Sequence, residues 1–357
     1  MKKSDYQFPH RRKNILTGEW VLVSPHRTSR PWQGEVSGPD QNDRREYEPG
    51  CYLCPGNKRA NGQVNPQYEN TFVFTNDFSA LLENSDNYNL NYDELLIAKS
   101  ERGICRVVNF SPRHDLTLAE MDESKIFNVI KTWQYEFEKL GSNPFINYVQ
   151  IFENKGSIMG NSNPHPHGQI WAQESIPLEA ANELKQFKKY YKKNNQSILH
   201  DYLKLELKMD ERIVFQNESF VALVPFWAVW PYETLIISRR KIASILQFNK
   251  KEEKDFANAL KTITTKYDNL FKISFPYSAG MHQAPTDGKS YEEFHFHMHF
   301  YPPLLRSASI KKFMVGYEML AEPQRDFTPE YSAQILKEFS PVHYKNVKEN
   351  IMSQLLI

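Results

Sequence analysis

The sequence lacks the features that would point to a membrane, a secreted scaffold or a highly charged partner. No apolar run approaches the roughly 20 residues of a membrane-spanning helix, so we expect no membrane segment. The formal net charge is only +1, which gives no global electrostatic reason to expect nucleic acid as a partner. Three cysteines cannot form a paired disulfide framework, and we therefore expect a location in the reducing cytoplasm.

Two similar series of elements fill the chain, which at 357 residues is long enough for one large domain or two ordinary ones. The first series has strand-like runs at 71–78 and 104–114, a helix at 118–141, and strands at 145–154 and 167–173. The second has runs at 219–226 and 233–241, a helix at 250–267, and a strand pair that ends at 292–303. A helical segment at about 178–208 separates the two series.

This order of elements predicts an α+β fold of two similar halves, with a mainly antiparallel sheet and helices packed outside it. The offset between the repeats is not constant, which indicates a diverged duplication and not a solenoid. We place the first half at residues 1–177 and the second at residues 178–350.

The stretch "CYLCPGN" carries two cysteines at a spacing that suits a metal ion. Cys51 and Cys54 are placed so that two thiolates can hold one tetrahedral ion from a tight turn. His114 and His165 would complete a Cys2His2 zinc set, although both are distant in sequence. From the residues alone, a redox pair or two surface thiols remain alternatives.

A second cluster of histidines stands in "FHFHMHFYPP". His295, His297 and His299 alternate with apolar residues, so strand geometry would place all three imidazoles on one face. A single histidine on a strand is usually a core residue with a partner, but three buried imidazoles need three sets of partners. The cluster therefore indicates a metal site or an active site, which His282 and a carboxylate could complete with zinc or iron.

The stretch "NPHPHGQIW" holds the candidate catalytic residues. His167 lies two residues after His165, and an imidazole there can act as a nucleophile if its other nitrogen is held by a backbone carbonyl. We expect Gly168 to leave room for a ligand. Gln169 offers an amide N–H to an anionic oxygen but no proton to a leaving group, which favours group transfer over hydrolysis.

Other polar segments indicate a phosphate-bearing ligand. Arg27 and Arg30 present guanidinium groups that match phosphate oxygens. The loop "ENKGSIMGNSNPH" at 153–165 is rich in small residues and N–H donors and can cradle phosphates. Asn76 and Asp77 could contact a ribose or a base, although they could equally form a turn at the end of a strand.

The chain resembles the galactose-1-phosphate uridylyltransferase family, a branch of the histidine-triad superfamily. The stretches that carry the resemblance run in order from about residue 15 to about 326. They are "TGEWVLVSPHRTSRPWQG", "CYLCPGN", "FVFTNDF", "SPRHDLTL", "FENKGSIMGNSNPHPHGQIWA", "HFYPPLLRSASIKKFMVGYEMLAE" and "QRD". The resemblance implies two histidine-triad-like halves whose sheet forms a half-barrel.

The activity that this resemblance implies is a ping-pong exchange of UMP. His167 would attack UDP-glucose, release glucose 1-phosphate and pass the uridylyl group to galactose 1-phosphate, giving UDP-galactose. Gln169 would hold a phosphoryl oxygen, and Ser162 would contact the outer phosphate. The family also shares its active sites across a dimer interface, so a homodimer is expected.

The resemblance further implies the remaining site residues. Cys51, Cys54, His114 and His165 match the zinc ligands of the family. Its second, iron-type site, which another divalent metal could fill, matches Glu183, His282, His297 and His299. Its nucleotide-binding positions match Arg27, Arg30, Asn76, Asp77 and Asn154, and Gly160, Asn161 and Ser162 line its phosphate loop. The sugar-phosphate positions match Lys312, Phe313, Tyr317, Glu318 and Gln324.

Two departures from the family pattern stand out. Asn161 occupies a position where the family is expected to have cysteine, and His295 is an additional histidine that could compete for the second metal. The alternatives weighed are a nucleotide-sugar phosphorylase, a hydrolase of the same superfamily and a zinc-dependent nucleic-acid-binding protein. Gln169 disfavours the hydrolase, the near-zero charge disfavours nucleic acid, and "KKFMVGYEMLAE" favours the uridylyltransferase.

Overall fold

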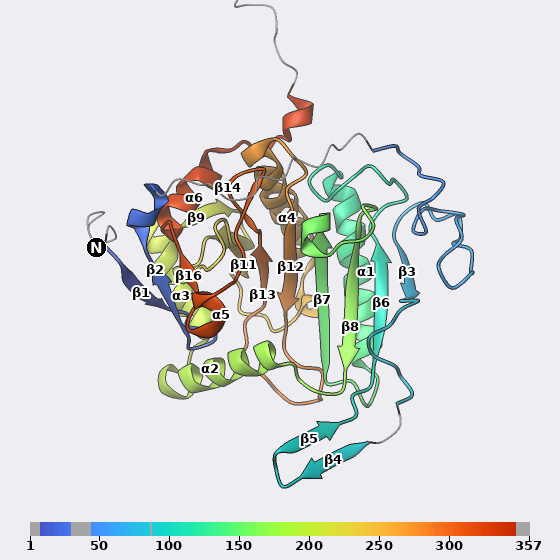
Figure 1. Cartoon of the computed structure of the whole chain (residues 1–357), viewed down its shortest axis with the longest axis horizontal. Helices are drawn as coiled ribbons and strands as arrows, with labels where there is room; N and C mark the ends of the chain where they lie inside the picture. Colours follow the sequence, from blue (N-terminus) through green and yellow to red (C-terminus); the bar gives the residue numbers. More distant parts are fainter. Residues whose placement is uncertain (1–7, 30–43, 86–87, 348–357) are drawn as a thin grey trace, which may run out of the picture.

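A nine-stranded sheet forms the centre of the protein (Figure 1). The computed structural model describes residues 8–29, 44–85 and 88–347. The order of the strands is β3-β6-β8-β7-β12-β13-β11-β10-β9, and every pairing is antiparallel. The strands are β3 (Phe72–Thr75), β6 (Gly103–Asn109), β7 (Tyr148–Lys155), β8 (His167–Gln173), β9 (Ile213–Gln216), β10 (Phe220–Leu223), β11 (Thr234–Ser238), β12 (Tyr277–His282) and β13 (His297–Tyr301).

The sheet repeats one pattern in opposite directions from its middle. The series β7-β8-β6-β3 on one side corresponds to β12-β13-β11-β10 on the other, and β7 pairs directly with β12. The prediction of an α+β fold with two similar halves and a mainly antiparallel sheet is therefore confirmed. The boundary between residues 177 and 178 falls immediately before α2, and as a division into domains it stays a prediction.

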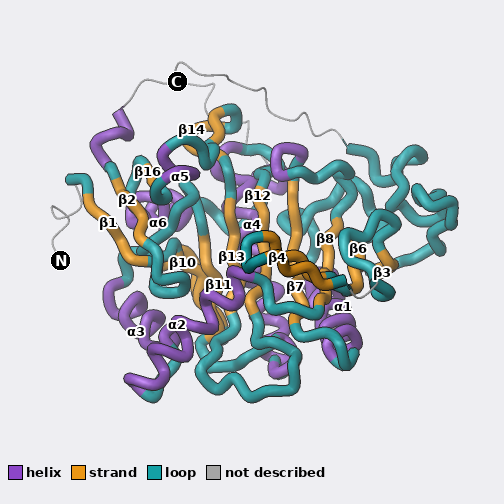
Figure 2. The backbone as a smooth tube through the Cα atoms, turned by 60° about the horizontal axis from the view of Figure 1, so that its bottom comes forward, coloured by secondary structure: helices purple, strands orange, loops and turns teal. Residues whose placement is uncertain are grey.

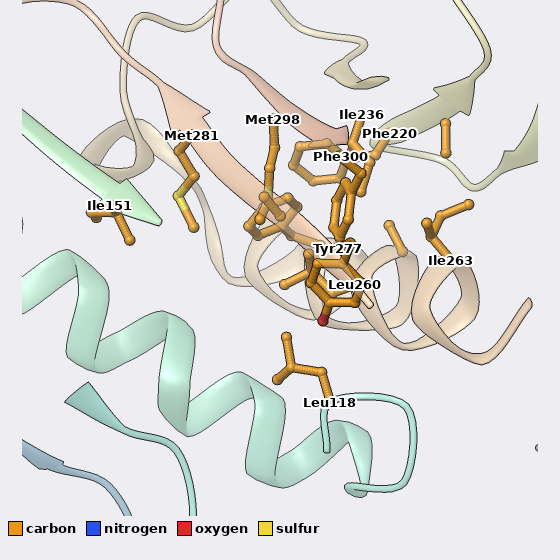
Figure 3. Close-up of a cluster of buried hydrophobic side chains, with 14 of the residues drawn as sticks. Leu118, Ile151, Phe220, Ile236, Leu260, Ile263, Tyr277, Met281, Met298 and Phe300 are labelled. Carbon is orange, nitrogen blue, oxygen red and sulfur yellow. The ribbon is translucent and has the colours of Figure 1, made fainter. Parts of the chain in front are cut away.

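Helices α1 (Glu123–Gly141) and α4 (Lys250–Phe271) pack on one face of the sheet. Ile126, Val129, Ile130 and Trp133 recur at helical spacing on α1 and enter the core that Figure 3 shows beneath the strands. The predicted helix at 118–141 begins only at Glu123. In the described residues, every helix is too short or too polar for a membrane-spanning segment.

Helices α2 (Leu178–Asn194) and α3 (Ile198–Met209) lie on the opposite face, against the second half of the sheet. The predicted helical segment at 178–208 is two helices, because Asn195 adopts the left-handed conformation with φ of 50° and ends α2. Leu184 and Phe187 of α2 join a core with Val221 and Leu235 of the strands. In Figure 1, α2 stops short of β8.

Alternation along the strands places His167 of β8 and His299 of β13 on the face of the sheet that α2 covers in part. On β8, Gly168 and Ile170 are buried, whereas His167 and Gln169 are partly exposed on the other side. Cross-strand neighbours share a face, and the register links Gln169 through Phe152 and Gly280 to His299. Since α2 covers only the second half, the face around His167 stays accessible while that around His299 is buried.

Smaller elements surround the central sheet (Figures 1 and 2). A three-stranded sheet joins β1 (His10–Lys13), β2 (Trp20–Val23) and β16 (Gln324–Arg325), with η2 (Pro25–Ser29) after β2. The chain before β16 forms β14 (Leu304–Ser307), β15 (Ile310–Lys311) and α5 (Tyr317–Leu320), and α6 (Pro329–Glu338) follows it. The hairpin of β4 (Asn89–Tyr92) and β5 (Leu96–Lys99) projects from the body. Single turns are η3 (Ser157–Met159), η4 (Ile245–Gln247) and η5 (Tyr344–Asn346).

Candidate functional site

Two thiols and two imidazoles meet beside the first half of the sheet. Cys51 and Cys54 lie in the loop that precedes β3. His114 follows β6, and His165 precedes β8. Their candidate ligand atoms lie within 4.8 Å of one another, and all four residues are buried. Cys54 Sγ is 3.6 Å from His114 Nδ1 and 3.5 Å from His165 Nδ1. The structure thus brings together four residues that are far apart in sequence.

Hydrogen bonds around this cluster orient the His165 imidazole toward the thiol of Cys54. His165 Nε2 lies 2.8 Å from the carbonyl oxygen of Ser111 and donates to it, so the Nδ1 lone pair faces Cys54. Asn163 accepts from the His165 backbone N–H at 3.0 Å and donates to Cys51 Sγ at 3.4 Å. This arrangement fits a soft divalent cation in a tetrahedral site. Burial raises the pKa of the Cys54 thiol to about 12, so a bound cation is needed to hold the thiolate.

A carboxylate and three imidazoles meet on the same face of the second half. Glu183 of α2 reaches His282 Nδ1 at 2.8 Å, His297 Nε2 at 3.2 Å and His299 Nε2 at 3.5 Å. Burial alone would raise the pKa of the Glu183 carboxyl, but His282 and His297 beside it lower it well below its usual value. Among the described residues, Nδ1 of buried His299 lacks a hydrogen-bond partner, and Nε2 has only the 3.5 Å contact with Glu183. An N and O donor set with an imidazole that makes no hydrogen bond fits a divalent metal.

His295 is not among the four residues whose ligand atoms gather here, but its ring lies 6.4 Å from that of His200 on α3, on the same side of the sheet. Strand β13 begins at His297, and His295 precedes it in a segment without strand alternation. Its Nε2 donates to the carbonyl oxygen of Ser238 at 2.7 Å. This contact corresponds to that between His165 and Ser111 in the first half, and both halves therefore use the same local geometry.

Among the described residues, one ring nitrogen of His167 has a hydrogen-bond partner and the other, Nε2, has none. Its Nδ1 lies 2.7 Å from the carbonyl oxygen of His165 and donates to it, so the proton sits on Nδ1 and the Nε2 lone pair stays available. Burial lowers the pKa of His167, which keeps the imidazole neutral near pH 7. A neutral, oriented imidazole with a free Nε2 can act as a nucleophile.

Two cavities meet at His167. One of about 330 Å3 runs under the loop after β7 and is lined by Glu153, Lys155, Ser157, Asn161 and Ser162. The other, of about 340 Å3, lies over the open face and is lined by Leu53, Phe74, Asn76, Asp77 and Gln169. His167 and Ser162 line both cavities. The histidine is therefore placed to act on a group that bridges two binding spaces.

Several predicted substrate residues of the first half line these cavities, but Gly160 and Asn154 are in neither lining as the structure describes it. Asn76 and Asp77 follow β3, and Asn161 and Ser162 follow η3. Gly160 has φ of 76° and ends η3. Asn154 lies two residues beyond the pair Phe152 and Gln169 on β7, and it accepts from Ser278 Oγ at 2.7 Å.

The predicted sugar-phosphate residues, and Arg27 of the predicted nucleotide-binding set, lie elsewhere in the same chain. Arg27 contacts Asp326 at 3.1 Å, and Lys312 contacts Glu318 in the segment around α5. Phe313 and Tyr317 are exposed there. The described linings of the two cavities at His167 include none of Arg27, Lys312, Phe313, Tyr317, Glu318 or Gln324. In Figure 1, α5 lies near β16 at the left of the view, whereas β8 lies in its right half. Arg30 falls outside the described residues.

Gly168 supports packing and not ligand access, contrary to the sequence-based expectation. A Cβ added there would lie 2.8 Å from Phe110 Cζ and 2.9 Å from the carbonyl oxygen of Phe152, on the buried side. We expect Gly168→Ala to push β8 away from β7, cost about 1–3 kcal/mol of stability and displace the residues on either side. Chemical denaturation and turnover test this, with Gly50→Ala as control, because its nearest atom would be Glu48 Oε1 at 3.7 Å. Unchanged stability and turnover would contradict the packing role.

Glu153 is a buried carboxyl in the wall of the first cavity. Burial raises its pKa from 4.5 to about 7, although Lys155 and the Tyr277 hydroxyl, which donates to it at 2.9 Å, oppose the shift. Between pH 4.5 and about pH 7, the Glu153 carboxyl keeps its proton in the folded protein, whereas it has lost that proton in the unfolded chain. The stabilising contribution of Glu153 is therefore complete below pH 4.5 and lost as the pH rises through 7.

We expect Glu153→Gln, which stays neutral and still accepts from Tyr277, to remove this pH dependence. Its free energy of unfolding relative to the wild type should rise by about 2–3 kcal/mol between pH 5 and pH 8. Urea unfolding at both pH values measures the difference, with Glu94→Gln on the exposed hairpin as control. The same difference at both pH values would show that the carboxyl is already ionised at pH 5.

Several supporting residues were not predicted from the sequence. The Tyr68 hydroxyl donates to the Leu53 carbonyl oxygen at 2.6 Å and lies 3.1 Å from His165 Nε2, and Asn163 connects the thiols to the backbone. Trp171 contacts Gln169. Asn163 and Trp171 lie within the motif stretch itself, so their proximity to the histidines was the available signal. Glu153 likewise begins the predicted phosphate loop at 153–165, whereas Tyr68 gave no such signal.

Comparison with solved structures defines the class of protein first. The fold matches a chain described as "Structure of uridylyltransferase" with a TM-score of 0.73 and 27% identity, covering 92% of this chain and 97% of that one. It also matches an ADP-glucose phosphorylase from Arabidopsis thaliana with a TM-score of 0.73 at 23% identity, covering 93% and 99%. The second match shows the fold alone. With the histidine-centred site, these features define a nucleotidyltransferase.

Family models and curated relatives then identify the family. The model of the galactose-1-phosphate uridyl transferase N-terminal domain matches residues 1–177, and that of the C-terminal domain matches residues 183–348. The galactose-1-phosphate uridylyltransferase of Saccharomyces cerevisiae is 50% identical, over 94% of this chain and 96% of that protein. The Haemophilus influenzae enzyme is also 50% identical, over 95% and 97%. The chain belongs to the galactose-1-phosphate uridylyltransferase family.

Proposed function

We propose that this protein exchanges UMP between UDP-glucose and galactose 1-phosphate, through a uridylyl group carried on His167. The observation that carries the proposal is the 2.7 Å hydrogen bond from His167 Nδ1 to the His165 carbonyl oxygen. It fixes a neutral tautomer with a free Nε2 where two cavities meet. The curated relatives bear the name of this activity.

In the first step, His167 Nε2 forms a bond to the α-phosphorus of UDP-glucose. The bond from that phosphorus to the bridging oxygen breaks, and glucose 1-phosphate leaves with the electron pair. The positive charge on the uridylylated ring is stabilised by the Nδ1–H donated to the His165 carbonyl. The proposed role of Gln169 is to donate its amide N–H to a non-bridging oxygen as charge develops.

In the second step, a phosphate oxygen of galactose 1-phosphate attacks the same phosphorus. The bond between phosphorus and Nε2 breaks, its electron pair returns to the imidazole, and UDP-galactose leaves. No proton has to be supplied to either leaving group, which agrees with an amide beside the nucleophile in place of an acid. Ser162, which lines both cavities, is the proposed contact for the outer phosphate.

We propose that the active form is a homodimer with shared sites. Asn76, Asp77 and Ser162 line the cavities at His167, whereas the segment of Lys312 and Tyr317 lies apart from them in the same chain. If both sets contact one substrate, the second set comes from another copy. The exposed Phe313 and Tyr317 are suited to such an interface.

Zinc is our proposal for the site of Cys51, Cys54, His114 and His165, because thiolates with imidazoles form a usual closed zinc set. For Glu183, His282, His297 and His299 we propose iron or another divalent metal, since imidazole with carboxylate suits both. Both clusters would fix strands and loops near His167, and neither has a proposed contact with the reacting phosphate. The described cysteines are all free thiols, which fits the reducing cytoplasm that we propose as the location.

Labelling with substrate tests the covalent step. UDP-glucose labelled in its uridine should leave acid-labile label on the wild-type protein and none on His167→Asn. Steady-state assays should then show galactose 1-phosphate preferred over inorganic phosphate as acceptor. Absence of label on an active wild-type enzyme would exclude the covalent route, and preference for inorganic phosphate would make the protein a phosphorylase.

A further inference from the structure

We infer that Trp171 is a positioning residue. It holds the side-chain amide of Gln169 so that the NH2 group of this amide faces the reacting phosphate. Trp171 Nε1 donates to Gln169 Oε1 at 3.0 Å. The two residues are separated by one position on β8, so their side chains lie next to each other on the face that carries His167. The inference rests on the proposed function, and specifically on the proposed role of Gln169.

The chemistry of the indole decides which way the amide points. An indole N–H can only donate a hydrogen bond, whereas a glutamine amide has one accepting end and one donating end. The end at 3.0 Å from Trp171 must therefore be the carbonyl oxygen. The NH2 group is left for the cavity that Gln169 lines together with His167. The reversed amide would place donors against each other and present an oxygen to the phosphate.

The indole is itself held in place by packing. Its ring meets Phe152 edge-on, with 5.7 Å between centroids and 76° between planes. Phe152 is the cross-strand partner of Gln169 on β7. Trp171, Phe152 and Gln169 thus form a small group on adjacent strands, in which the ring contact fixes the indole and the indole fixes the amide. Such preorganisation costs nothing at the moment of reaction.

Trp171→Phe tests the inference, because it keeps an aromatic ring against Phe152 and removes only the donor. We expect the single-turnover rate of UMP transfer from UDP-glucose to fall about 10-fold, with little change in the KM for UDP-glucose. Replacing Trp171 by 3-benzothienylalanine, which keeps both rings and substitutes sulfur for N–H, should give the same loss. This second variant covers the case in which the smaller ring impairs folding.

Trp133→Phe is the matched control. Trp133 also lies edge-on against a phenylalanine, Phe110, with centroids 5.7 Å apart, but it is buried and its Nε1 has no hydrogen-bond partner in the described part of the chain. Loss of this N–H should leave the rate unchanged. A further test combines Trp171→Phe with Gln169→Glu, whose carboxylate has no donor to orient. In that background the Trp171 substitution should cause no additional loss.

The outcomes separate this inference from the proposed function. If wild-type protein takes up uridylyl label while both Trp171 variants keep the wild-type rate, the positioning role is wrong and the proposed function stands. An additive loss in the Gln169→Glu background also overturns the inference, because Trp171 would then act independently of the amide. If the wild type transfers no UMP at all, the proposed function itself fails.

Discussion

His167→Asn is expected to lower the turnover of UDP-glucose with galactose 1-phosphate by at least about 10^4-fold, because it removes the only atom proposed to form a bond to phosphorus. Asparagine is small enough for the site, and its amide can still donate to the His165 carbonyl oxygen that His167 Nδ1 now contacts. We therefore expect the fold and the affinity for substrate to survive. Steady-state kinetics and calorimetric binding of UDP-glucose measure the two effects separately.

His200→Asn provides the control for this substitution. His200 lies on α3, outside both histidine clusters and both cavities at His167 as far as the structure describes them. It should retain wild-type turnover. Residual activity of His167→Asn within about 100-fold of the wild type would mean that the oxygen of the acceptor attacks UDP-glucose directly. In that case the histidine would serve as a binding group.

Cys54→Ser is expected to have the largest effect on stability. Cys54 is buried and lies within 3.6 Å of both His114 and His165, so it connects the turn after residue 44 to the ends of β6 and β8. Loss of one ligand from a closed four-ligand site should remove most of the metal and cost several kcal/mol of folding free energy. Elemental analysis and thermal unfolding, with and without a chelator, measure the two effects.

Cys105→Ser is the matched control, since Cys105 is equally buried on β6 but belongs to neither candidate metal cluster. It should keep the metal and respond to chelator as the wild type does. If Cys54→Ser retained full metal content and thermal stability, Cys54 would not be a ligand of a structural metal. The choice of acceptor should not change in either variant, because the proposed metal role is structural.

Much of the fold was predictable because the two halves repeat the same hydrophobic pattern. The strand at 167–173 agrees with β8 to the residue, and the helix at 250–267 is contained in α4. Boundaries were less accurate where the backbone ends an element without a distinctive residue. Asn195, which separates α2 from α3, lies in a run of polar residues that gave no unique position for the break.

The candidate site was predictable to the extent that its residues stand in local motifs. Both sets of four potential ligands meet in space as the family resemblance implied. One expectation failed because it depends on which face of the sheet a position occupies. Gly168 faces Phe110 on the buried side. The separation of Lys312 from His167 is a property of the tertiary fold, which no local pattern encodes.

The direct pairing of β7 with β12 has a consequence for how this polypeptide can be divided. The bonded register from Tyr277 opposite Lys155 to Met281 opposite Ile151 joins the halves through backbone hydrogen bonds. A fragment ending near residue 177 would expose β7 as an unpaired edge strand, and the complementary fragment would expose β12. Because each edge is a template for the other, we expect the two fragments, produced separately, to recombine by strand addition.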